Sequence, residues 1–78
     1  MPRYFFHIVD GDEIIEDCEG TELPDLEAAV LDALHSARHL LADRIRRGEL
    51  ANGQRFEVRD EAGELVAIVP FQDAIRLS

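Results

Sequence analysis

A single amphipathic segment constrains the fold of this chain more than any other feature of its sequence. Residues 24–47 place apolar side chains at intervals of three and four, which at about 100° per residue form one continuous stripe. The stripe consists of Leu26, Ala29, Val30, Ala33, Leu34, Ala37, Leu40, Leu41 and Ile45. Pro24 suits a first helical turn, and Gly48 suits the left-handed residue that often ends a helix. The sequence therefore predicts one long helix in a chain of only 78 residues.

A β-hairpin is predicted on each side of this helix. Residues 3–16 contain an aromatic and β-branched run followed by Asp10-Gly11, a typical two-residue hairpin turn. Residues 55–70 contain the second hairpin. Its first strand, residues 55–59, alternates like a half-buried edge strand, whereas residues 65–69 are apolar on both faces, which is typical of a central strand.

The whole chain is expected to form one domain of the α+β class. Its segments in order are hairpin 3–16, acidic loop 17–23, helix 24–47, hairpin 55–70 and a short C-terminal tail, 71–78. The order β-β-α-β-β predicts a four-stranded antiparallel or mixed sheet with the long helix packed on one face.

One helix covers only one face of a sheet, yet the first and last predicted strands are apolar on both faces. A contiguous apolar patch left in water is unusual for a monomer, and so small a domain buries little surface by itself. We expect a second copy of the chain to cover this face, with folding of the tail over it as the alternative. The residues expected at the homodimer interface are Phe5, His7, Val9, Val66, Ile68 and Phe71.

Charge favours some partners and excludes others. The net charge is −9, and residues 10–27 contain nine acids and no base. This field opposes binding to nucleic acid and suits a basic protein partner. No apolar run is long enough to span a membrane, and residues 1–5 lack the pattern of a signal peptide, so we expect a cytoplasmic protein with no membrane partner.

Two patterns resemble metal sites. His35 and His39 are four residues apart on the predicted helix and share one face, but the glutamate of an HExxH motif is absent. A solvated helix face is the preferred interpretation, and the two histidines are only weak candidates for a metal site. Asp10 and Asp12 have the first spacing of an EF-hand loop, but Ile15 stands where that loop requires glycine, which excludes the calcium motif.

No motif indicates catalysis. Cys18 lies between Asp17 and Glu19, whose negative charges disfavour its thiolate, and nothing in the sequence positions a histidine beside it. Several arginines could bind a phosphate or carboxylate, although protection of an edge strand and complementation of the helix dipole are the preferred interpretations. These are Arg38, Arg46, Arg47, Arg55 and Arg59. We expect no catalytic residues, no cofactor and no enzymatic activity.

The chain resembles a family of small bacterial proteins classified only as a domain of unknown function. The resemblance is carried by residues 1–7, 10–11, 17–23 and 69–71, and it implies no activity. By fold analogy alone, β-β-α-β-β also resembles small bacterial antitoxin domains. The sequence thus favours a non-enzymatic, homodimeric protein-interaction or regulatory module. The alternatives are an antitoxin-like inhibitor of a basic protein and a weak metal-binding protein that uses His35 and His39.

Overall fold

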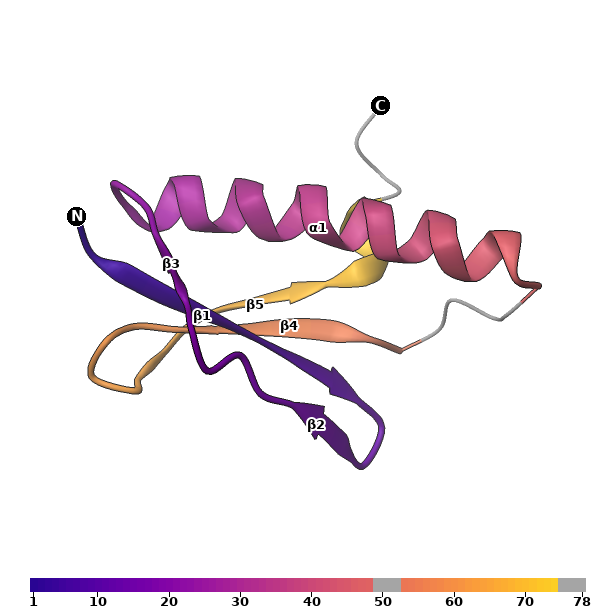
Figure 1. Ribbon diagram of the computed structural model, residues 1–78, viewed down its shortest axis with the longest axis horizontal. Helices are drawn as coiled ribbons and strands as arrows, with labels where there is room; N and C mark the ends of the chain where they lie inside the picture. The colour runs from indigo at the N-terminus through magenta and orange to yellow at the C-terminus, as the bar shows by residue number, and fades with distance from the viewer. Residues whose placement is uncertain (49–52, 75–78) are drawn as a thin grey trace.

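A computed structural model describes residues 1–48 and 53–74. The elements in chain order are β1 (Arg3–Asp10), β2 (Glu13–Ile15), β3 (Thr21–Glu22), α1 (Leu26–Arg46), β4 (Arg55–Arg59), β5 (Leu65–Pro70) and a 3₁₀ turn, η1 (Phe71–Ala74). The predicted α+β class is confirmed: α1 packs on one face of an antiparallel sheet (Figure 1). No helix among residues 1–48 and 53–74 is long and apolar enough to cross a membrane.

The sheet has five strands rather than the four that were predicted. Its order is β2-β1-β4-β5, and β3 pairs with the same edge of β1 as β2 does. β2 pairs with residues 8–10 of β1, whereas β3 pairs with Arg3 and Tyr4. The segment predicted to be an acidic loop therefore includes a short strand. It escaped prediction because two paired residues are too few to show alternation.

The predicted positions of the last two strands in the sheet are wrong. β4 lies inside the sheet, between β1 and β5, and β5 is an edge strand. Alternation in β4 arises because one of its faces packs under the helix while the other stays open, which is as compatible with an interior strand as with an edge. β5 is apolar, yet Leu65 and Ile68 are exposed.

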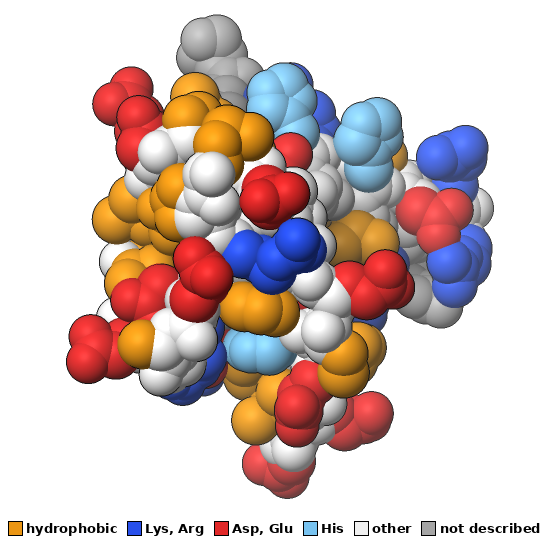
Figure 2. Space-filling view, turned by 60° about the vertical axis from the view of Figure 1, so that its left-hand side comes forward, with side chains coloured by type: hydrophobic (Ala, Val, Ile, Leu, Met, Phe, Trp, Pro, Cys, Tyr) orange, Lys and Arg blue, Asp and Glu red, His pale blue; other side chains and the backbone are white. Residues whose placement is uncertain are grey.

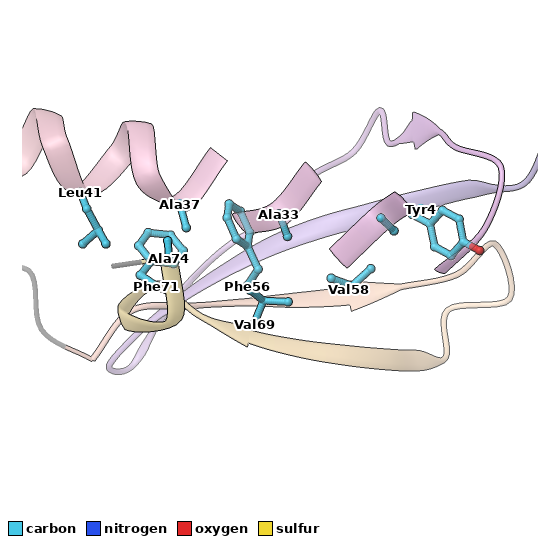
Figure 3. Packing of buried hydrophobic residues seen from close by; sticks show 10 residues of the cluster. Tyr4, Ala33, Ala37, Leu41, Phe56, Val58, Val69, Phe71 and Ala74 are labelled. Atoms are coloured by element: carbon cyan, nitrogen blue, oxygen red, sulfur yellow. The ribbon is translucent and has the colours of Figure 1, made fainter. Parts of the chain in front are cut away.

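The helix begins slightly later than predicted and ends close to the predicted residue. Asp25 is its N-cap, and the Asp25 carboxylate accepts a hydrogen bond of 2.8 Å from the backbone N–H of Ala28. Pro24 therefore precedes the cap. The residues that α1 buries against the sheet are Ala29, Ala33, Ala37 and Leu41 (Figure 3). Three leucine and isoleucine positions of the predicted stripe, Leu26 at the first residue of α1, Leu40 and Ile45, are exposed.

The C-terminal turn packs on the helix side of the sheet. Phe71 is 2% exposed, and its ring lies 4.9 Å from that of Phe56 (Figure 3). Ala74 belongs to the same buried cluster. The prediction of Phe71 as an interface residue is wrong, because this side chain is part of the core. The alternative in which the tail covers the second face is also wrong for residues 71–74. The rest of that tail, residues 75–78, lies outside the described residues.

Candidate functional site

The sheet face opposite the helix is not the continuous apolar patch that the sequence predicts. Residues directly opposite one another in a sheet share a face, so Phe5, His7 and Val9 stand beside the outward side chains of β4. Those side chains are Arg55, Glu57 and Arg59, and the glutamate pairs with both arginines, at 3.4 and 3.3 Å. Ile68 follows on β5, opposite the glutamate. The sheet order thus places a charged row between two apolar groups.

The residues expected at the interface therefore lie in different environments. Phe5 and His7 are half-buried on this open face, Val9 is buried within it, and Ile68 is exposed. Val66 lies next to an irregularity in the β4–β5 ladder and packs against the core on the helix side. Protection of an edge strand does not explain Arg55 and Arg59, since β4 is interior.

Asp17 lies between β2 and β3. Its hydrogen bonds hold this segment against the edge of β1. Its carboxylate accepts hydrogen bonds from the backbone N–H groups of Phe6 and Gly20, both at 3.1 Å, and of Glu19 at 3.3 Å. Its own backbone N–H donates to Nδ1 of His7 at 3.0 Å. Partial burial acts to raise the pKa of the Asp17 carboxyl group, but these backbone hydrogen bonds and nearby His7 lower the pKa below its ordinary value of 3.8.

His7 and Asp17 thus have a structural role in this region. This role of Asp17 was not predicted from the sequence, although an aspartate that precedes glycine by three residues is typical of a turn.

Gly20 completes the same turn. Its φ is +71°, and a Cβ atom at this position would lie 2.8 Å from Cγ of Arg3 and 2.9 Å from Cε2 of Phe5. The side chain of Arg3 donates a hydrogen bond of 2.8 Å to the backbone oxygen of Glu19. Only glycine provides both the left-handed backbone and the space for this contact.

The two edges of the sheet differ in charge. The edge formed by β2, β3 and their connections carries exposed acids, which are Asp12, Glu13, Glu16, Glu19 and Glu22. Figure 2 shows acidic side chains gathered at the bottom of the view, around the β1–β2 turn. The opposite edge, β5, contains no charged residue. Among the described residues, no strand pairs with the outer side of β5.

The candidate metal and catalytic residues form no such centre in the described part of the chain. His35 and His39 are exposed on α1, and residues 1–48 and 53–74 contain no group of three or more His, Cys, Asp or Glu that could hold a metal ion. The pair therefore has no third side-chain ligand there. Cys18 is an exposed thiol.

The arginines of the candidate anion site are dispersed over α1 and β4, and three of them are oriented toward acids. Arg55 and Arg59 both pair with Glu57, and Arg47 pairs with Asp43 on the next turn of α1. The five residues therefore do not converge on one anion site.

Charged side chains around a shallow hollow between α1 and β2 also pair with one another. The hollow is lined by Ile8, Ile15 and Leu40 together with Asp10 of β1 and charged residues of α1. Asp10 accepts a hydrogen bond of 3.3 Å from Arg44 and one of 3.1 Å from Nε2 of Gln54. Charges in this hollow are already matched within the fold.

Comparisons with known proteins identify a family and no activity. Neither the curated proteins nor the solved structures contain a match to this chain. A family model described as Domain of unknown function (DUF6894) matches residues 3–72, which include every strand and the helix. The chain therefore belongs to this family of domains of unknown function.

Proposed function

We propose that this chain is a non-enzymatic, homodimeric protein-interaction module that associates through its β5 side. The observation that carries the proposal is an uncharged edge strand on which Leu65 is 44% and Ile68 is 52% exposed. Natural edge strands are usually protected by charge, by shortness or by a covering element, because unpaired backbone groups recruit other strands. Pro70 gives β5 such protection only at its end.

Size supports the same proposal. A domain of 78 residues buries a smaller fraction of its unfolded surface than a larger domain does, and the buried face of α1 consists largely of alanines. Removal of further apolar surface from water contributes about 25 cal/mol per Å², before the cost of association. Dimer formation therefore adds core to a domain that has little of its own.

The direct test is the mass of the protein in solution. Light scattering on a size-exclusion peak is expected to give twice the chain mass of 8.8 kDa at micromolar concentrations. Dilution is expected to lower the midpoint of thermal unfolding, because dimer stability depends on protomer concentration. A mass of 8.8 kDa throughout the micromolar range would contradict the proposal.

The acidic edge favours a second candidate, an antitoxin-like inhibitor of a basic protein. Nine acids between residues 10 and 27 lie at the end of β1, in β2, β3 and their connections and at the start of α1, and most are exposed. Such an edge attracts a basic surface at low salt. Affinity purification from the native cell is expected to recover one basic protein, and salt is expected to release it. Addition of the chain is expected to inhibit the activity of that protein. Recovery of no basic partner would exclude this candidate.

A further inference from the structure

We propose that two copies join through antiparallel pairing of their β5 strands around a twofold axis at Ile68, so that two sheets become one. The inference rests on the proposed homodimer and specifies its contact surface and register. It replaces the open sheet face, which the sequence favoured, as the surface of association.

The ladder of the sheet determines which backbone groups of β5 are available. The N–H of Phe71 donates to the backbone oxygen of Gln54 at 2.9 Å, one position beyond the paired residues Arg55 and Pro70. Bonded and non-bonded pairs alternate in an antiparallel ladder. Val69 therefore directs its N–H and C=O toward β4, whereas Ile68 directs both groups away from the sheet.

A second hydrogen bond supports this assignment from the other side of the sheet. The same alternation, carried across β4, makes the N–H of Phe6 point away from β4. That N–H donates to Asp17 at 3.1 Å, on the β2 side of β1. The alternating direction of the backbone N–H and C=O groups is thus consistent across β5, β4 and β1. The same alternation explains how β5 accommodates Pro70. The backbone nitrogen of Pro70 faces away from β4, so the absence of an N–H there costs no hydrogen bond to β4.

The outward groups of Ile68 are complementary to themselves. A twofold axis at this residue lets each Ile68 N–H donate to the carbonyl oxygen of the partner's Ile68, which forms two reciprocal hydrogen bonds. Twofold interfaces require this kind of self-complementarity. The exposed Ile68 side chains, on the face away from the helix, also meet across the axis.

The helix offers a second apolar contact on the same side of the molecule. One flank of α1, which carries Leu40 and Arg44, faces Ile8 and Ile15 across the shallow hollow on the β2 side. Relative to the buried row of α1, at about 100° per residue, Leu34 is turned by roughly 80° toward the β5 side, whereas Leu31 is turned by roughly 140° and lies on the solvent side of that flank. Leu34 packs against the core, whereas Leu31 is 52% exposed.

Pairing of β5 strands would bring the two helices close together. The axis leaves both helices on one face of the joined sheet, and α1 contacts both β4 and β5. Because strands lie about 4.8 Å apart, a helix above β4 and β5 would lie roughly 10–14 Å from its counterpart. Helices in contact are separated by about 8–10 Å, so the flanks that carry Leu34 would face one another, with Leu31 at the outer margin of the contact.

Charge selects this edge over the other. Pairing through β2 and β3 would bring two rows of acids together, and like charges at close range repel. Pairing through β5 brings together strands without charge and directs the acidic edges outward.

The test compares two exposed isoleucines on different parts of the sheet. Ile68→Lys places a charge at the proposed axis, whereas Ile14→Lys places one on β2, where the side chain is 62% exposed. We expect Ile68→Lys to weaken dimerisation by more than about tenfold and to retain the circular dichroism spectrum of a folded chain. The Ile14→Lys control is expected to remain dimeric.

A measurement on the unmodified protein makes the test independent of whether the variants fold. Hydrogen exchange at the Ile68 amide is expected to be at least about tenfold slower in the dimer than in the diluted monomer, because this N–H acquires a partner only across the axis. A dimer with a rapidly exchanging Ile68 amide would overturn β5 pairing but not the homodimer. Loss of the dimer in Ile14→Lys would do the same and would point to the open face. A monomeric wild-type protein would overturn both proposals.

Discussion

Substitution of Phe71 by alanine distinguishes a core residue from an interface residue. The side chain is 2% exposed, and its ring contacts that of Phe56 at a centroid distance of 4.9 Å. Phenylalanine-to-alanine changes at buried sites cost about 3–5 kcal/mol. A chain of 78 residues has a total stability of about 4–12 kcal/mol, at roughly 0.05–0.15 kcal/mol per residue. Phe71→Ala is therefore expected to remove between a quarter and all of the folding free energy.

Urea unfolding followed by far-ultraviolet circular dichroism measures this loss. All samples are compared at one protein concentration, because dimer formation would otherwise contribute to the difference. Gln72→Ala provides the matched control: Gln72 is the next residue of η1 and is exposed, so a change within about 0.5 kcal/mol is expected. A Phe71→Ala variant that is folded, monomeric and destabilised by less than about 1 kcal/mol would refute the core assignment.

Three further predictions concern the turn around Asp17 and the start of the helix. Gly20→Ala is expected to lower the free energy of unfolding in urea more than Gly63→Ala does. Both glycines have positive φ, but only at Gly20 would a Cβ atom meet another atom at 2.8 Å. Equal losses would contradict this close contact. The lowered pKa of Asp17 stabilises the fold above the unfolded value of about 3.8, and this contribution is lost as the pH falls toward the lower folded value. The stability difference between wild type and Asp17→Asn should therefore shrink from pH 6 to pH 3 in urea titrations, and a constant difference would argue against the carboxylate's role. Asp25→Ala should cost about 1 kcal/mol in thermal unfolding, and an unchanged midpoint would mean that the cap contributes nothing.

The helix was predictable because its signals are local. Apolar spacing, the acidic first turn and Gly48 all lie within one segment, and each acts through residues at most four positions apart. The hairpin turn at Asp10-Gly11 is local in the same way, and β1 and β2 do meet there. Pairing of β1 with β4 spans some fifty residues of chain, and no local pattern encodes such a contact.

The strand order was not predicted because the alternation of apolar and polar residues indicates which side chains are buried. It does not indicate which strands pair with one another. Residues 55–59 alternate since one face of β4 meets the helix, and β5 appears central since it is apolar. Which strand is at the edge depends on where β1 pairs, and this is decided by tertiary packing. The same choice placed Glu57 and its two arginines in the middle of the open face, which removed the expected apolar patch.

The alanines of α1 have a consequence for the entropy of folding. Ala29, Ala33 and Ala37 are completely buried, and an alanine side chain has no rotamers to lose on burial. The helix therefore packs against the sheet at little cost in side-chain freedom, although each contact also buries little area. Any larger residue at these positions would both lose rotamers and displace the helix from the strands beneath it. These alanine positions are consequently expected to tolerate less variation in side-chain size than the positions of Phe56 and Phe71.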